Sequence, residues 1–302
     1  MRYVIIGGSA AAIGCIEGVR SVDKTGEIIL ITGETEWNYS RPLISYLLEG
    51  KTTRDKMWCR PDSFFTRNGV TVKAGVLATA LDAGDRTVRL STGERLAYDR
   101  LLAATGSRPF VPPIPGLETV ERTFCFQTLS DASALAEALR PESRVLILGA
   151  GLTGVKCAEG IRGLCAQIAI ADLAPRVLPA VLDDTAAAMV QARMEEKGVR
   201  FYLNDSAAAF RGNTARLQSG TELEFDVLVT AVGVRPNTQL VADAGGAVDR
   251  GILVDGRCAT TLPDVYAAGD CAQGYDAVSG EKRMLPLWPN AVLQGETAGI
   301  NM

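Results

Sequence analysis

The stretch RYVIIGGSAAAIG, residues 2–14, decides the fold. Its apolar run Tyr3–Ile6 is too short for a helix and has the length of a buried strand. Residues 7–9 then turn the chain, and Ala10–Ile16 can begin a helix made of small residues. This order brings backbone N–H groups to the positive end of a helix, an arrangement that suits a pyrophosphate.

The loop departs from the glycine pattern G-x-G-x-x-G, because Ser9 and Ala12 occupy the second and third glycine positions. Alone, such a loop could be only a tight turn. Glu34 follows the next apolar run, Ile28–Thr32, at the distance where an acid receives the ribose hydroxyls of a dinucleotide. We therefore expect a first cofactor to bind at Gly7, Ser9, Ala10, Ala11 and Glu34.

A second copy of the pattern strengthens this interpretation. The buried run Val145–Leu148 leads into a complete fingerprint, and the strand Ile168–Ala171 ends at Asp172, again at the expected distance. The residues predicted to bind a second dinucleotide are Gly149, Gly151, Leu152, Thr153, Gly154 and Asp172. In each unit a later strand also ends in a small-residue turn, which adds Ala104, Thr105, Gly106 and Arg108 to the first site and Ala231, Val232 and Gly233 to the second.

The remaining segments alternate between strands and helices. Strands are expected over 70–72, 76–80, 199–203, 252–255 and 265–268, with hairpins at 87–98 and near 219–220. Helices are expected over 131–139, 185–197 and from Ala291, the first capped by Ser130 or Asp131. A further helix should follow the loop at 37–46 with Ser40 as its N-cap. The prolines and glycine within 109–116 indicate a domain linker.

The amino-acid composition excludes several classes of function. The chain has 302 residues, is 47% hydrophobic and carries a net charge of −4, which predicts about two domains and argues against nucleic-acid binding. No apolar run approaches a membrane span. Histidine is absent, which excludes Ser-His-Asp and Cys-His catalysis and histidine metal sites. The seven cysteines form no C-x-x-C, so we expect no disulfide framework, no metal, and a cytoplasmic location.

The order of motifs resembles the two-dinucleotide-binding flavoproteins of the pyridine nucleotide–disulfide oxidoreductase family over nearly the whole chain. The segments that carry the resemblance are GGSAAAIG, YSRPLIS, LLAATGSRP, LILGAGLTG, AVGVRPN, VYAAGDCA and PLWPNAVLQG. Within the family, the chain is most similar to the branch of rubredoxin reductases and NADH oxidases, which includes flavin subunits related to assimilatory nitrite reductase.

The resemblance implies an α/β fold of two Rossmann-like domains with three-layer β/β/α architecture, the NAD domain inserted into the FAD domain. The FAD domain would comprise 1–112 and 237–302, and the NAD(P)H domain 113–236. The first fingerprint would take FAD and the second NADH, with NADPH disfavoured by Asp172. Further FAD contacts are expected at Arg41, Pro42, Ser45, Gly269, Asp270, Pro286, Leu287 and Trp288.

The sequence also departs from the family. The redox disulfide is missing, because there is no C-x-x-C and no cysteine in the loop Tyr39–Tyr46. The third, interface-forming domain is expected to be absent, the chain being either a shortened piece or a minimal version. Relatives commonly carry a glutamate–lysine pair beside flavin N5, and here Lys156 and Tyr46 stand at those positions. We expect Lys156, Tyr46 and Trp288 to act at the flavin.

These observations predict an NADH-dependent FAD oxidoreductase. Hydride would pass from nicotinamide to flavin N5, and the electrons would pass to a rubredoxin or iron–sulfur protein, or to oxygen. Two alternatives remain open at this point. One is a cysteine-dependent disulfide or CoA-disulfide reductase, and the other is a flavin-bearing sensor or assembly partner with little turnover.

Overall fold

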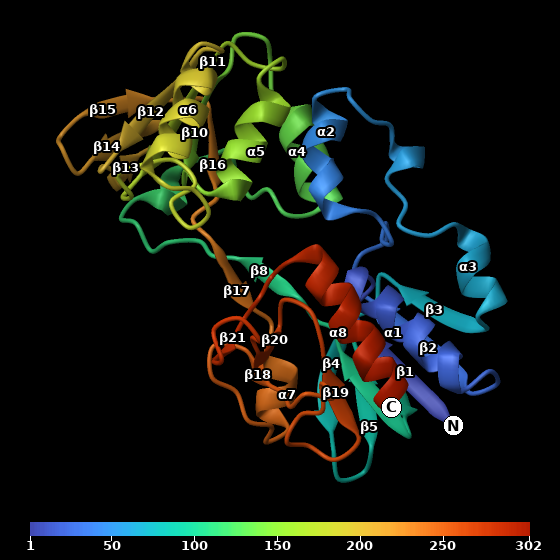
Figure 1. The fold of residues 1–302 in the computed structure, drawn as a ribbon. Helices are drawn as coiled ribbons and strands as arrows, with labels where there is room; N and C mark the ends of the chain where they lie inside the picture. The colour runs from blue at the N-terminus through green and yellow to red at the C-terminus, as the bar shows by residue number, and fades with distance from the viewer. The chain divides into compact units, whose positions relative to one another are not determined.

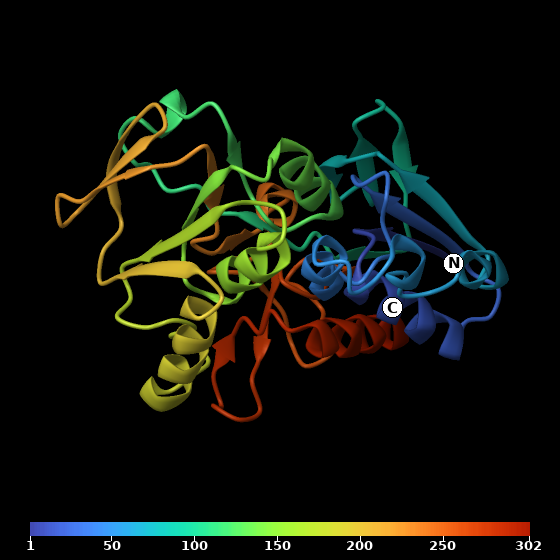
Figure 2. The same ribbon diagram turned by 90° about the horizontal axis from the view of Figure 1, so that it is seen from above.

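The computed structural model describes residues 1–302, which form two compact units (Figure 1). The first unit consists of Met1–Ser40, Trp58–Arg108 and Pro236–Met302, and the second of Arg41–Met57 and Pro109–Arg235. The chain leaves the first unit twice, first for Arg41–Met57 and again at β8 (Ser107–Pro109), and it returns the second time at β17 (Val234–Pro236). Both termini belong to the first unit and lie near each other in the two views (Figures 1 and 2).

A five-stranded parallel sheet forms the centre of the first unit. Its strands, in the order β19-β7-β1-β2-β3, are Val265–Ala267, Arg100–Ala103, Arg2–Ile6, Glu27–Thr32 and Val70–Ala74. Strand β1 is buried on both faces, as its unbroken apolar run predicts for a central parallel strand. Tyr3 and Ile5 belong to the core on one face, and Val4 and Ile6 to the core on the other.

Different layers cover the two faces of this sheet. Helices α1 (Ala10–Val22) and α8 (Trp288–Asn301) contribute to the core around Ile5. An antiparallel sheet of β4 (Ala78–Asp82), β5 (Thr87–Leu90) and β6 (Arg95–Ala97) contributes to the core around Val4. The remaining elements are α3 (Asp62–Arg67), α7 (Gln239–Asp243), β18 (Ile252–Leu253), β20 (Ala272–Tyr275) and β21 (Lys282–Arg283).

Helices α1 and α8 pack backbone against backbone. A Cβ placed on Gly295 would lie 2.0 Å from the Ala11 carbonyl oxygen, and one on Gly299 would lie 2.3 Å from the Cys15 carbonyl oxygen. In the other direction, a Cβ on Gly14 of α1 would lie 2.2 Å from the Val292 carbonyl oxygen of α8. The crossing therefore requires glycine, and it holds the C-terminal helix against the helix that starts at the first loop.

The second unit repeats the plan. Its parallel sheet has the order β12-β11-β10-β16-β9, formed by Val199–Leu203, Gln167–Asp172, Arg144–Leu148, Val227–Thr230 and Thr123–Phe124. The antiparallel layer is β13 (Ala207–Arg211), β14 (Thr214–Leu217) and β15 (Glu222–Glu224), which packs on β10 through Phe210 and Leu217. The helices are α2 (Ile44–Leu48), α4 (Leu129–Ala138), α5 (Leu152–Ile161) and α6 (Asp184–Glu195).

The predicted fold class is confirmed, whereas several local boundaries differ. Helix α4 is capped by Thr128, not by Ser130 or Asp131, because Thr128 and Asp131 form a reciprocal capping box. Ser40 caps no α-helix, because a 3-10 turn at Arg41–Leu43 precedes α2. Strand β4 begins at Ala78 rather than Val76. Helix α8 begins three residues before Ala291, since the proline that follows Trp288 is tolerated in a first helical turn.

None of the helices has the length and apolar character needed to cross a lipid bilayer.

Candidate functional sites

The first loop has the shape that the sequence predicts. Gly7 has a φ of 118°, and a Cβ on it would meet the Ala104 carbonyl oxygen at 2.0 Å. Glycine is therefore required at this position. Helix α1 starts at Ala10 without a side-chain cap from Ser9 and without an acid in its first turn. Its positive N-terminus is left for an external anion.

Residues distant in sequence surround this helix start. Gly269 adopts a φ of 80°, and a Cβ on it would lie 3.3 Å from the Ala11 Cβ. Its backbone N–H donates to the Gln294 Oε1 atom at 2.9 Å. Asp270 accepts a hydrogen bond from Ser107 at 3.0 Å. The predicted residues Gly269 and Asp270 thus lie beside the first loop and beside the turn after β7, respectively.

The acid after β2 already has a partner. Glu34 Oε2 accepts a hydrogen bond from the Tyr39 hydroxyl at 2.6 Å. A carboxylate has two oxygens and several lone pairs, so this bond leaves capacity to accept further hydroxyl groups. Tyr39 is itself buried and fixes the direction of the carboxylate. No sequence pattern indicates this role for Tyr39.

The turn after β7 is held by a residue that the sequence analysis missed. Asn237 donates from its side-chain amide to the Thr105 carbonyl at 2.9 Å, and its backbone N–H donates to the Gly106 carbonyl at 2.9 Å. Thr105 Oγ1 donates to the Asn237 carbonyl, and Arg108 donates to the Asn237 side-chain oxygen. The signal was the position of Asn237 directly after a proline at the end of AVGVRPN.

The second loop shows the same backbone geometry. Gly149 has a φ of 108°, and its Cβ would lie 2.4 Å from the Ala231 carbonyl oxygen. A Cβ on Gly154 would lie 1.9 Å from the Gly149 carbonyl oxygen. Gly151 differs, since no atom lies within 4 Å of its Cβ position. The open space at Gly151 is where a phosphate could approach the backbone.

Asp172 closes the second loop from the next strand. Its carboxylate accepts the Ala150 N–H at 2.6 Å and the Ala174 N–H at 2.7 Å. Arg176, four residues later, donates to the carbonyls of Pro179 and Leu182 and pairs with Asp184 at 3.1 Å. Arg176 is therefore held by its own loop.

Apolar side chains remain exposed around the second loop. The exposed fractions are 64% for Leu152, 62% for Leu173 and 37% for Val232. They follow β10, β11 and β16, whose carboxyl ends meet at one edge of the parallel sheet. Ligands of such sheets bind at that edge. Exposed apolar walls beside an uncapped helix suit the rings and pyrophosphate of a dinucleotide.

The predicted residues Arg41, Pro42 and Ser45 group with the second unit, not with the first loop. Arg41 donates to the Gln127 carbonyl at 3.1 Å. The Ser45 Oγ atom is buried and has no hydrogen-bond partner. Helix α2 approaches α5 closely, because a Cβ on Gly160 would lie 2.9 Å from the Ser45 carbonyl oxygen.

The interface between α2 and α5 carries a charged cluster. Lys156 Nζ lies 4.2 Å from the centre of the Tyr46 ring and forms an ion pair with Glu159. Lys51 lies 5.7 Å from the same ring and pairs with Glu49 at 2.8 Å. The hydrogen bond from Lys156 lowers the pKa of Glu159, and Lys51 lowers it further. Lys156 and Tyr46 are thus in contact, as a cation and an aromatic face.

The remaining predicted residues lie at the start of α8. Trp288 is its first residue and is 40% exposed, and Pro286 and Leu287 directly before it are also exposed. Their predicted role at the flavin stays a prediction.

The cysteines are poor candidates for redox chemistry. All seven are free. Burial raises the pKa of six of these thiols, those of Cys15, Cys59, Cys157, Cys165, Cys258 and Cys271. For Cys165 and Cys258 the pKa rises to about 11. A thiol that stays protonated is a weak nucleophile. No group of three or more cysteine and acidic side chains is arranged to hold a metal ion.

The two loops fit the dinucleotides that the sequence implies. Neither α1 nor α5 has a side-chain hydrogen bond to its first turn, and neither first turn contains an acid. Two phosphate-binding loops, each followed by a carboxylate at the next strand, therefore provide a pair of anion sites in one chain.

Comparison with known proteins agrees with this geometry. The sequence profile of the pyridine nucleotide-disulphide oxidoreductase family matches residues 1–295. The chain is 33% identical to the NADH-dependent phenylglyoxylate dehydrogenase subunit epsilon of Aromatoleum evansii, over 100% of the chain and 72% of that protein. It is 29% identical to rubredoxin-NAD(+) reductase of Pseudomonas putida, over 98% of the chain and 78% of that protein.

Among solved structures, the chain is similar to the reductase in a covalent putidaredoxin reductase–putidaredoxin complex. The TM-score is 0.92 at 26% identity, and the match covers 99% of this chain and 74% of the other. The similarity spans both units and the strands that connect them.

Proposed function

Because the chain belongs to the pyridine nucleotide-disulphide oxidoreductase family, we propose that it takes electrons from NADH through FAD and delivers them to an external iron–sulfur or rubredoxin-type protein. The observation that carries this proposal is the pair of uncapped helix starts, each with its own carboxylate. The relatives named for NADH and for rubredoxin support the electron donor and the class of acceptor.

FAD belongs to the first unit in this proposal. The N–H groups of Ala10 and Ala11 would hold its pyrophosphate, and Glu34, aimed by Tyr39, would receive the ribose hydroxyls. Gly269 and Asp270 would close the site beside the same helix start. When bound, the flavin supplies the hydride and single-electron chemistry, and the protein orients it and controls its electrostatics.

NADH belongs to the second unit. The backbone around Gly151 would hold its pyrophosphate, and Asp172 would accept hydrogen bonds from the ribose diol and repel a 2′-phosphate. The hydrogen bonds of Arg176 to its own loop favour NADH over NADPH, because they hold its guanidinium to Pro179, Leu182 and Asp184 instead of leaving it to neutralise that phosphate.

Lys156 is proposed to act on the flavin electrostatically. Its contact with Tyr46 fixes the position of the ammonium group, and its pairing with Glu159 moderates the positive charge. A cation near the flavin N5–C4 edge would favour the anionic reduced form. The free cysteines agree with a cytoplasmic location, which we propose on that ground.

The test is anaerobic stopped-flow mixing of the FAD-loaded protein with NADH, followed by mixing with oxidised rubredoxin, a [2Fe–2S] ferredoxin or oxygen. We expect rapid flavin bleaching and faster reoxidation by one of the two proteins than by oxygen. A flavin that NADH does not bleach would indicate the sensor alternative. Loss of acceptor reduction after alkylation with iodoacetamide would indicate the cysteine-dependent alternative.

A further inference from the structure

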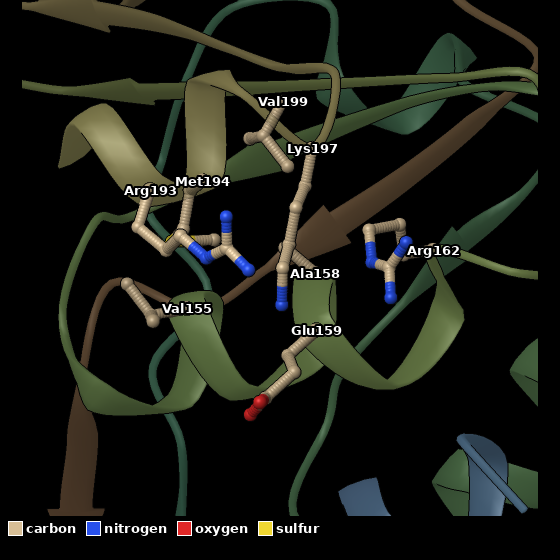
Figure 3. Close-up of a pocket in the computed structure, with 8 residues that line it drawn as sticks. All are labelled: Val155, Ala158, Glu159, Arg162, Arg193, Met194, Lys197 and Val199. Atoms are coloured by element: carbon tan, nitrogen blue, oxygen red, sulfur yellow. The ribbon is translucent and has the colours of Figure 1, made fainter. Parts of the chain in front are cut away.

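A recess in the second unit lies between α5 and α6, and the proposed function does not use it. Its floor is apolar, formed by Val155, Ala158, Met194 and Val199. Its rim is charged and consists of Glu159, Arg162, Arg193 and Lys197 (Figure 3). The space is about 500 Å³, including the open mouth.

Three cations reach this recess from two sides. Arg193 lies in α6, Lys197 in the turn after it, and Arg162 directly after the last residue of α5. Figure 3 shows Lys197 extended across the space in front of Ala158, with Arg162 and Arg193 on either side of it. Of the three cations, only Arg193 forms an ion pair within the chain, with Glu196 at 2.7 Å. Both members of that pair are well exposed, so it neutralises Arg193 only weakly.

The single acid of the rim balances these charges only in part, because Lys197 attracts the Glu159 carboxylate and contributes to its lowered pKa. Glu159 forms its ion pair with Lys156, on the side of α5 that faces α2. Figure 3 shows its carboxylate directed away from Arg162 and Arg193. The chain as a whole carries a net charge of −4, so this excess of cations is local and not a general property of the surface.

We propose that the recess binds a small organic carboxylate with an apolar body. The carboxylate would lie between Arg162 and Lys197, where a guanidinium offers two parallel donors and an ammonium adds a third. The apolar body would cover Val155, Val199 and the flexible Met194 side chain, which adapts to different shapes. A few placed charges over an apolar floor are typical of small-molecule sites.

Isothermal titration calorimetry on the FAD-loaded protein tests this proposal, with NAD⁺ present at saturation so that the second loop is filled. The probes are octanoate, the neutral analogue octan-1-ol, and inorganic phosphate as a charge without an apolar body. We expect octanoate to bind at least tenfold more tightly than either of the others, because octan-1-ol lacks the charge and phosphate lacks the apolar body. Equal affinity for octan-1-ol or for phosphate would overturn the proposal, as would no octanoate binding at millimolar concentration.

The double variant Arg162→Ala/Lys197→Ala should weaken octanoate binding at least tenfold. The matched control is Arg211→Ala, which removes an exposed arginine from β13 of the same unit and should leave the affinity unchanged. If the double variant has a lowered melting temperature, the single variant Lys197→Glu provides the same test by charge reversal. Wild-type affinity in a folded double variant, or in Lys197→Glu, would contradict the assignment. Rapid flavin reduction by NADH is measured separately, so failure of this proposal does not touch the proposed function.

Discussion

At the scale of single residues, the most informative change concerns Lys156. By resemblance, Lys156 stands where relatives carry the glutamate of the pair and Tyr46 where they carry the lysine, so the cation has changed position. The structure adds two partners of Lys156 that sequence alone does not reveal. The Tyr46 ring fixes the ammonium group, and Glu159 partly neutralises it. The negative charge of Glu159 offsets part of the field of the Lys156 ammonium. The shift that Lys156 causes in the flavin potential should therefore be smaller than that of an isolated cation.

Replacing Lys156 with methionine keeps the stem and removes the charge. We expect the potential of the bound FAD to fall by on the order of 30 mV, equal to about 1.4 kcal/mol for a two-electron couple, and reduction by NADH to slow. Glu159→Gln is the opposing variant, because it leaves Lys156 without its ion pair and should raise the potential. Spectroelectrochemical titration measures both. Shifts of the same sign in the two variants would show that neither charge acts on the flavin.

Asp172 should set the choice of nicotinamide cofactor. Asp172→Ser should lower kcat/KM for NADH by about tenfold to a hundredfold, the usual range for losing a charged hydrogen bond, while the value for NADPH falls less. The matched variant is Arg176→Ala, which should leave the NADH/NADPH ratio unchanged because the native guanidinium is bonded to its own loop. Steady-state kinetics with both cofactors tests the pair. A large rise in the ratio for Arg176→Ala would place that arginine beside the ribose after all.

At the scale of elements, the crossing of α1 and α8 links stability to the first loop. Gly295→Ala would place a methyl group 2.0 Å from the Ala11 carbonyl oxygen, so the helices must move apart. We expect a loss of about 1–3 kcal/mol in unfolding free energy, with weaker FAD retention because Ala11 belongs to the loop helix. Gly256→Ala is the control, since no atom lies within 4 Å of its Cβ position. Urea unfolding and the FAD content of the purified variants are the measurements.

Among the elements, some features could be predicted from the sequence and others could not. Both strand–loop–helix units were predictable because a short apolar run, a glycine with positive φ and a chain of small residues each restrict the backbone locally. The cap of α4 was misplaced by two or three residues, because Thr128 forms a reciprocal box that competes with its polar neighbours.

The segment Arg41–Met57 was beyond sequence reasoning for another reason. It groups with the second unit because Gly160 lets α5 approach Ser45 and because Lys156 contacts Tyr46. These contacts join residues more than 100 positions apart, and no local pattern encodes them. Likewise, Asn237 and Tyr39 were missed because their roles depend on which turn or carboxylate they meet in the folded chain.

At the scale of the whole molecule, two loops with the same backbone geometry lie in different units. A change in one loop should therefore weaken the binding of one dinucleotide and leave the other bound. Gly151→Ala adds a methyl group where no atom lies within 4 Å, so folding should be preserved while the pyrophosphate of NADH is obstructed. We expect KM for NADH to rise by about tenfold, within the range for one lost charged hydrogen bond, with one FAD still bound per chain.

The reciprocal variant is Glu34→Ala, which removes the carboxylate that Tyr39 aims in the first unit. It should lower the FAD content of the purified protein while NADH still binds, as measured by quenching of tryptophan fluorescence. Each variant serves as the control for the other, because both act on a phosphate loop or its acid but in different units. FAD loss in Gly151→Ala, or loss of NADH binding in Glu34→Ala, would contradict the assignment of one dinucleotide to each unit. If Gly151→Ala weakens only NADH binding and Glu34→Ala weakens only FAD binding, the two loops bind dinucleotides in the same way. They then differ in which dinucleotide they bind, and hence in their role in electron transfer.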